Sequence, residues 1–391
     1  MRELFRPVFN ILLLLSIAGA AFGSGNDGDT TKETETSAII NGTAGSISTY
    51  PWIVYLAYDT GEQYCGASLI SPTWILTAAH CFLNEAGDEI DIETGALSRV
   101  FLNTDTTTPP GSAAIEGAIG QIIIHPNYQP NMETSPNPND FDIALVEITA
   151  AVELQPIPLL AAGAPTIAAG IEGIIMGWGT TQVNEENEST DASNTLLQAR
   201  QTIVDNDTCL EIYTDGITDN MICAGGSAAA PTADTCQGDS GGPLSIASGT
   251  SFVQVGVVSF GGIGGPSCGD PESPGVYASV AALADFIQQH ATDASFTTLE
   301  ANAGTPAPIL ATSVVGTTLT LSWTEVPGAT GYILYYAPFP AQSPIGSLDV
   351  GALIILSGDL EIGTSLYVAV QPYNANGPID VFSNVEIFTI E

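Results

Sequence analysis

The chain has 391 residues, of which 43 are acidic and 5 are basic, and its formal net charge at pH 7 is −38. A field of this sign repels nucleic acid and anionic membranes and attracts cationic ligands, so neither of the first two is expected as a partner. The length exceeds that of one typical domain, and a second unit is therefore expected.

The first 23 residues have the pattern of a secretory signal peptide. Arg2 and Arg6 precede an apolar run at 11–18, and Ala21-Phe22-Gly23 forms a small-x-small cleavage site. The run is too short to cross a membrane, and no later stretch reaches about 18 uninterrupted apolar residues. We therefore expect a secreted, extracellular protein without a membrane span.

From residue 39 to about 289, apolar runs alternate with turn residues. The runs at 52–56, 121–124 and 253–258 suit strands, and Gly, Pro and Asn interrupt them. Helical spacing is clear only at 280–287. This pattern predicts an all-β fold with one helix near its end.

The composition changes toward the C-terminus. Residues 292–304 are small and polar, which predicts a linker. The runs at 319–323, 332–336 and 366–370 then alternate with period two and carry aromatic residues. We expect a separate β-sandwich over 305–391, a segment that contains no cysteine, lysine or arginine.

The segment Gly238-Asp239-Ser240-Gly241-Gly242-Pro243 places one serine among glycines. Because glycine lacks a Cβ atom, this backbone can turn sharply and aim the amides of Gly238 and Ser240 at one substrate oxygen. Such a pair of donors would form an oxyanion hole. A lone Gly-x-Ser-x-Gly would be weak evidence, but the fuller string rarely arises by chance.

A serine hydroxyl needs a base to become a nucleophile, and the base needs an orienting carboxylate. His80, one of three histidines, lies in Leu76-Thr77-Ala78-Ala79-His80-Cys81. Asp142 begins an apolar segment suited to holding a carboxylate out of water. The other two histidines, His125 and His290, are interpreted as a loop residue and a helix-end charge.

These motifs resemble the chymotrypsin (trypsin-like) family of serine proteases over residues 39–291. The family's order of catalytic residues is His, Asp, Ser, which implies His80 as general base, Asp142 as its orienting partner and Ser240 as nucleophile. It also implies two six-stranded antiparallel β-barrels with a C-terminal helix. Gly177-Trp178-Gly179 is similar to the family's mid-chain turn.

The resemblance also implies a specificity pocket. Asp234, six residues before Ser240, matches the pocket floor of trypsin-like members, and Gly261 and Gly275 match its walls. A buried carboxylate requires a compensating cation, so Arg or Lys side chains are the expected ligands. Ser259-Phe260-Gly261 resembles the substrate-pairing strand, with Phe260 in place of the usual tryptophan, and residues 262–267 make a longer rim than usual.

Six cysteines permit fifteen pairings. The family pattern implies Cys65 with Cys81, Cys209 with Cys223, and Cys236 with Cys268. Cysteine ligation of a metal is the competing interpretation, but no Cys-x-x-Cys spacing occurs.

We expect no cofactor and no metal. The acidic residues Glu85, Asp88, Glu89, Asp91 and Glu93 lie where some relatives bind calcium. They lack the alternate-residue pattern of a dedicated loop, so a solvated loop is favoured and a structural calcium ion is the alternative.

Ile39-Ile40-Asn41-Gly42 resembles the family's mature N-terminus, which implies a pro-segment over 24–38. In the family the amine released at the position of Ile39 pairs with the carboxylate at the position of Asp239. Here the bond to be cut follows Ala38, which a pocket floored by Asp234 should reject. We therefore predict a zymogen that depends on an external activating protease.

The C-terminal segment resembles a fibronectin type III domain, with Trp323 as its core tryptophan and Tyr367 on the strand that commonly carries its core tyrosine. Spacer, partner-binding and folding-aid roles stay open, because the fold alone does not choose among them.

The combined hypothesis is a secreted, monomeric serine endopeptidase that cleaves proteins or peptides after Arg or Lys. The alternatives are a non-catalytic binding or adhesin protein on a protease scaffold, and an esterase-like hydrolase on the same fold. The complete set of triad, loop and pocket residues favours the endopeptidase.

Overall fold

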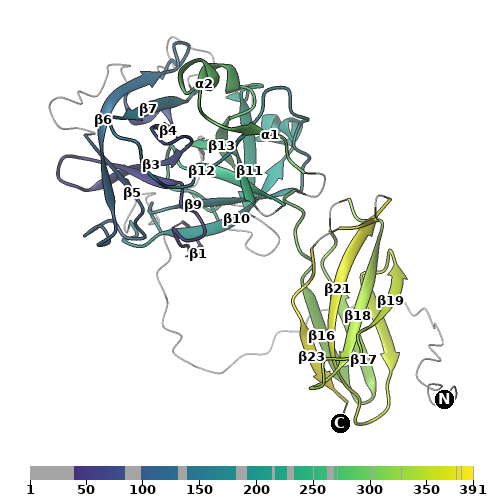
Figure 1. The fold of residues 1–391 in the computed structure, drawn as a ribbon. Coiled ribbons are helices and arrows are strands. Elements are labelled where there is room, and N and C mark those ends of the chain that lie inside the picture. Colours follow the sequence, from purple (N-terminus) through teal and green to yellow (C-terminus); the bar gives the residue numbers. More distant parts are fainter. Residues whose placement is uncertain are drawn as a thin grey trace. The chain divides into compact units, whose positions relative to one another are not determined.

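The structure is a computed structural model that describes residues 39–83, 98–130, 139–181, 192–213, 216–226, 233–249, 251–261, 268–270, 272–300, 303–326, 328–375, 377–379 and 381–390. The chain divides into two compact units, Thr36–Pro306 and Ala307–Glu391 (Figure 1). The predicted signal peptide, pro-segment, acidic cluster at 85–93 and pocket rim at 262–267 lie outside the described residues.

Six strands of the first unit close into an antiparallel barrel in the order β2, β3, β4, β7, β6, β5. Their bounds are Ile53–Ala57 (β2), Gln63–Leu69 (β3), Trp74–Thr77 (β4), Arg99–Leu102 (β5), Ile115–Ile124 (β6) and Ala144–Ile148 (β7). Every residue of β2 is buried, which suits its β-branched and aromatic composition. Tyr55 packs against Phe101 and Trp178, with ring centroids 4.9 and 5.2 Å away.

Six further strands form a second closed ring, in which β12, β9, β10, β11, β14 and β13 each pair with the next and β13 pairs back with β12. Their bounds are Glu172–Gly177 (β9), Leu197–Val204 (β10), Met221–Gly226 (β11), Pro243–Ser248 (β12), Ser251–Phe260 (β13) and Gly275–Ser279 (β14). Two short strands pair directly with strands of this ring, Thr43–Ala44 (β1) with β10 and Leu159–Leu160 (β8) with β13. The two six-stranded barrels confirm the predicted architecture.

The described part of the first unit contains two α-helices and one 3-10 helix. They are Asn206–Tyr213 (α1), Ala284–His290 (α2) and the 3-10 turn Ala79–Cys81. The helix predicted at 280–287 thus begins later, because residues 280–283 form a turn whose Leu283 is the N-cap of α2. No helix within the described residues is long and apolar enough to cross a membrane.

The stretch predicted as a linker is bonded to the second barrel along much of its length. Phe296–Thr297 (β15) pairs in parallel with β8, and the Gly304 amide donates to the Ala247 carbonyl at 2.9 Å. Leu299 and Ala303 pack against the core of this barrel. The boundary between the two compact units accordingly falls after Pro306.

The second unit is a β-sandwich, as predicted. One sheet has the order β16, β17, β20, and the other has the order β19, β18, β21, β22, with β23 also paired to β21. The bounds are Leu310–Val315 (β16), Thr318–Trp323 (β17), Gly331–Pro338 (β18), Gly346–Gly351 (β19), Ile355–Asp359 (β20), Ser365–Asn374 (β21), Gly377–Pro378 (β22) and Glu386–Thr389 (β23).

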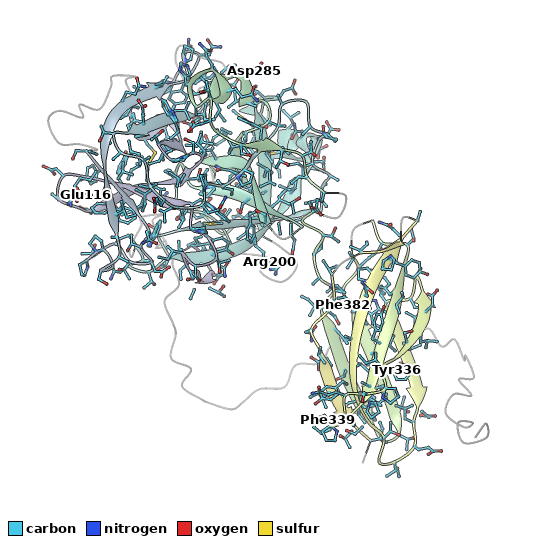
Figure 2. All side chains as sticks on the ribbon, in the orientation of Figure 1. Glu116, Arg200, Asp285, Tyr336, Phe339 and Phe382 are labelled. Carbon is cyan, nitrogen blue, oxygen red and sulfur yellow. A yellow bond between two sulfur atoms is a disulfide. The ribbon has the colours of Figure 1, made fainter. Side chains whose placement is uncertain are left out.

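Both sheets contribute to the sandwich core, where Trp323 packs edge-on against Tyr332 with ring centroids 5.7 Å apart. Tyr367 lies half-buried and contacts Phe339 instead. Phe339 and Phe382, both labelled in Figure 2, remain 41% and 49% exposed. The tyrosine buried beside Trp323 is therefore Tyr332, on β18, whereas Tyr367 lies on β21.

Truncation tests the role of the segment that joins the two units. A variant ending at Ala291 loses β15 and exposes apolar surface under Leu299 and Ala303, so its melting temperature should fall by roughly 5 °C or more relative to a variant ending at Pro306. Differential scanning calorimetry of both would measure this. Equal melting temperatures would show that residues 292–306 contribute nothing to the barrel.

Candidate active site

His80 and Asp142 are brought together by neighbouring strands of the first barrel. His80 follows β4 on the 3-10 turn and Asp142 precedes β7, and these two strands pair. Atom Nδ1 of His80 lies 2.7 Å from Oδ2 of Asp142, and the His80 amide donates to Oδ1 at 2.9 Å. The Ser259 hydroxyl donates to the same Oδ2 at 2.5 Å. Three donors therefore hold a carboxylate that is only 1% exposed.

The two partners shift each other's proton affinity. Burial alone would raise the pKa of Asp142, but the charge of His80 and the three hydrogen bonds lower it below its usual value. Burial lowers the pKa of His80, but the charge and hydrogen bond of Asp142 outweigh this and raise it overall. With the Nδ1 proton held by the carboxylate, Nε2 is left to accept a proton.

Ser240 lies beside the His80 segment. Its carbonyl accepts the Gly66 amide at 2.8 Å, and Sγ of Cys81 lies 3.9 Å from the same oxygen. No hydrogen bond between the Ser240 hydroxyl and His80 is present among the described residues. Nucleophile–base bonds in enzymes without substrate are commonly long and tighten in the substrate complex.

The loop around Ser240 has the backbone conformation that its glycines permit. Gly238 has φ +96° and Gly241 has φ +80°, values that residues with a Cβ rarely adopt. The Asp239 amide is used within the loop, where it donates to the Cys236 carbonyl at 2.9 Å. Among the described residues, no acceptor takes the amide of Gly238 or of Ser240, so both remain available as donors.

Asp239 is fully buried beside Ser240. Oδ1 accepts the Gly179 amide at 2.9 Å and Oδ2 accepts the Cys236 amide at 3.0 Å. None of the ion pairs formed by the described residues involves this carboxylate. Burial therefore raises the pKa of Asp239 to about 7, with the two amides only partly offsetting it.

Asp234 is 8% exposed and is also held by backbone amides. Thr235 donates to Oδ1 at 2.8 Å and Gly269 donates to Oδ2 at 3.0 Å. Burial raises its pKa to about 6. A Cβ atom on Gly275 would lie 3.3 Å from Oδ1, and one on Gly261 would lie 3.8 Å from the Gly275 Cα. The predicted pocket floor and the two predicted wall glycines are therefore adjacent.

The other predicted substrate-binding residues lie at the end of β13. Ser259 has its hydroxyl on Asp142, and Phe260 is half-buried, edge-on to Tyr213 with ring centroids 5.9 Å apart.

The three disulfides join the pairs that the resemblance implied, namely Cys65–Cys81, Cys209–Cys223 and Cys236–Cys268. Cys65 and Cys81 approach His80 closely enough to share a metal ion. Both sulfur atoms are used in the disulfide, however, so this group offers no thiolate ligand.

Three residues near the site were not predicted from the sequence. Gln63 donates from Nε2 to the Gly238 carbonyl at 2.6 Å. Tyr277 is fully buried, and its hydroxyl lies 3.2 Å from where a Gly275 Cβ would stand. Gly66 binds the Ser240 carbonyl. Gln63 is a polar residue in a hairpin, and Tyr277 and Gly66 lie in strands, so no sequence periodicity marks them as part of the site. Their roles are apparent only from their contacts in the structure.

Glycine is required where the backbone approaches Asp239. A Cβ on Gly179 would lie 2.6 Å from the Asp239 carboxylate, so Gly179→Ala should destabilise the fold by roughly 2 kcal/mol or more. The matched control is Gly216→Ala, since nothing lies within 4 Å of the added methyl there. Thermal unfolding of both variants measures the difference, and an equal effect would contradict the close packing around Asp239.

Comparison with known proteins agrees with this geometry. The family model described as Trypsin matches residues 39–287. Ovochymase from Halocynthia roretzi is 32% identical over 257 residues, which are 64% of this chain and 15% of that protein. Trypsin from Saccharopolyspora erythraea is 29% identical over 251 residues, 64% of this chain and 97% of that protein. Transmembrane protease serine 7 from Mus musculus is 32% identical over 260 residues, 64% of this chain and 28% of that protein.

The matched region thus spans nearly the whole bacterial trypsin but only 15% and 28% of the ovochymase and the transmembrane protease. Because the family model covers well over half of the chain and coincides with the two barrels, this chain belongs to the trypsin family of serine proteases.

Proposed function

We propose that this chain is a secreted serine endopeptidase that hydrolyses peptide bonds after Arg or Lys. The observation that carries the proposal is the buried Asp142 carboxylate 2.7 Å from His80 Nδ1, on the segment beside Ser240. A carboxylate held this way keeps the imidazole in the tautomer that accepts a proton at Nε2.

In the proposed reaction the Ser240 Oγ attacks the substrate carbonyl carbon while its proton passes to Nε2 of His80. The amides of Gly238 and Ser240 hold the oxygen that gains charge. His80 then returns the proton to the leaving amine as the C–N bond breaks, and an acyl-enzyme remains. Water then attacks the acyl carbon while His80 takes its proton. His80 returns that proton to Ser240 Oγ as the ester bond breaks, which releases the carboxylic acid product and restores the serine. No cofactor enters this scheme.

The preference for Arg or Lys is supported by the state of Asp234. Its two backbone donors do not compensate burial, because its pKa stays at about 6 rather than below 4. A guanidinium or ammonium group placed against it would supply the missing charge. Gly261 and Gly275 themselves add no side chains to the space beside Asp234.

Synthesis as an inactive precursor is supported by Asp239 and by the burial of Ile39. Ile39 is fully buried in the core of the second barrel, and its neighbour Ile40 exchanges backbone hydrogen bonds with Asp234. A new amine at Ile39 would therefore arise close to the Ser240 loop. In this proposal it pairs with Asp239, whose burial without a cation is costly.

The C-terminal sandwich is proposed to be a fibronectin type III-like module, supported by its two sheets and by Trp323 in the core they share. Proteins and peptides are the proposed substrates, consistent with the family, and the protease domain is proposed to act as a monomer.

Labelling by a serine-directed phosphonate tests the enzymatic proposal. The activated chain should be labelled at Ser240, and Ser240→Ala should not react. Absence of labelling in the activated wild type would instead favour a binding protein on a protease scaffold, because such a scaffold has no activated serine.

Asp234→Ser tests the specificity. The wild type should prefer Arg or Lys over Phe or Leu before the scissile bond, and the variant should lose about 10²-fold of that preference. Benzamidine affinity for the wild type should weaken as pH falls through about 6, because protonated Asp234 no longer offers a negative charge. The variant should show no such step, and an unchanged cleavage profile in it would refute the pocket assignment.

Activation is tested by incubating purified precursor alone, with trypsin, and with an elastase-like protease that accepts Ala before the cut. Hydrolysis of an Arg substrate should rise on the order of 10²-fold only in the third case, together with an N-terminal sequence beginning at Ile39. Trypsin can cut the predicted pro-segment only at Lys32, which leaves Glu33–Ala38 attached. Prompt self-activation, or full activity with this segment attached, would contradict the scheme.

A further inference from the structure

One side chain of the first barrel reaches the Ser240 loop of the second. Gln63 is the first residue of β3, and its Nε2 atom donates to the Gly238 carbonyl at 2.6 Å. The two residues are 175 positions apart in the chain. This hydrogen bond therefore fixes the loop relative to the barrel that carries His80.

The Gly238 carbonyl that accepts this hydrogen bond belongs to a peptide unit inside the proposed oxyanion loop. The unit between Gly238 and Asp239 separates the two amides proposed as oxyanion donors, those of Gly238 and Ser240. Its C=O is held by Gln63, and its N–H is held by the Cys236 carbonyl at 2.9 Å. Rotation of this unit would turn the flanking amides away from their common target, so the two bonds together fix the direction of both donors.

Gly238 itself offers little resistance to such a rotation. It has φ +96° and no side chain, and glycine populates several backbone conformations at similar energy. Its α-carbon is confined by neighbours instead, because an added Cβ would lie 3.0 Å from Gly179 Cα and 3.1 Å from Gln63 Oε1. Gln63 thus contributes both a contact and a hydrogen bond at a glycine of the loop.

We propose that Gln63 is a positioning residue that holds the oxyanion loop in its active conformation. It touches neither substrate nor the reacting atoms, and it acts through the Gly238–Asp239 peptide unit. Its neutral amide donor suits a carbonyl acceptor and adds no charge near the buried Asp239. The inference rests on the proposed peptidase function and adds a residue that the catalytic motifs do not contain.

The test compares two inhibitors of the activated chain. Benzamidine needs only the pocket around Asp234. A peptide aldehyde ending in arginine adds Ser240 Oγ to its carbonyl carbon and places the resulting oxygen against the oxyanion amides. Gln63→Met keeps the volume but removes the donor. It should weaken the aldehyde about 10-fold or more and lower kcat by a similar factor, with benzamidine affinity and KM nearly unchanged.

Two further substitutions at this position separate the donor from the packing. Gln63→His retains an N–H donor and should recover most of the aldehyde affinity. Gln63→Glu directs a carboxylate at the Gly238 carbonyl and should be impaired at least as much as Gln63→Met. Thermal unfolding of each variant shows whether it is folded. If one of these two variants does not fold, the other still shows whether the donor at this position is required.

The matched control is Gln121→Met on β6. Gln121 also donates from its side-chain amide, to Glu147 Oε2 at 2.8 Å, but it lies on the exposed side of the first barrel. This variant should leave both inhibitors and kcat unchanged. If Gln63→Met leaves aldehyde affinity unchanged, or weakens both inhibitors equally, the positioning role is overturned. Failure of the wild type to react with the serine-directed phosphonate would instead overturn the proposed function itself.

Discussion

The burial of Asp239 is the constraint on which the rest of the site depends. Its carboxylate is fully enclosed, and its two backbone donors come from segments far apart in the chain, Gly179 and Cys236. Gly177 and Gly179 must lack side chains, because a Cβ on either would stand within 2.6 Å of the carboxylate. Gly238 and Ser240 flank Asp239 in the same loop, so the conformation of this loop sets the direction of their amides. The packing around Asp239 and the Gln63 hydrogen bond to Gly238 therefore act together on the geometry of the proposed oxyanion hole.

The buried carboxylates of Asp142, Asp234 and Asp239 differ in the partners that offset their loss of hydration. Asp142 has His80 and Ser259 as side-chain partners, and its pKa is lowered. Asp234 and Asp239 have backbone donors without a cation among the described residues, and burial raises their pKa values to about 6 and about 7. Under the proposed function each carboxylate gains a cation that the precursor lacks: a substrate side chain for Asp234, and for Asp239 the amino group that cleavage would create at the buried Ile39. The cost of burying these two carboxylates without a cation would then favour substrate binding at Asp234 and the activation step at Asp239, because each brings a positive charge to the acid.

The sequence predicted the parts of the site that depend on short motifs. The Gly-rich loop around Ser240 and the segments of His80 and Asp142 could be identified because their residue types are unusual at those spacings. The Gln63 contact could not, because a glutamine at the start of a hairpin strand looks like any exposed polar residue. The small, polar composition of residues 292–304 predicts a linker. Its attachment to the barrel is made largely by backbone hydrogen bonds, such as that of Gly304, which composition does not report.

The scarcity of basic residues acquires a further meaning under the proposed specificity. Beyond residue 38 the only lysine or arginine residues in the sequence are Arg99 and Arg200. Arg99 makes two bonds to Glu116 at 2.8 and 2.9 Å and lies over the Phe101 ring. Arg200, labelled in Figure 2, binds Glu172 at 2.7 Å. Each lies in a strand that is paired on both sides, and a protease needs an extended, unpaired segment at the bond it cuts. Under the proposed specificity, the scarcity of Lys and Arg would thus leave a chain that begins at Ile39 with few bonds at which it could digest itself.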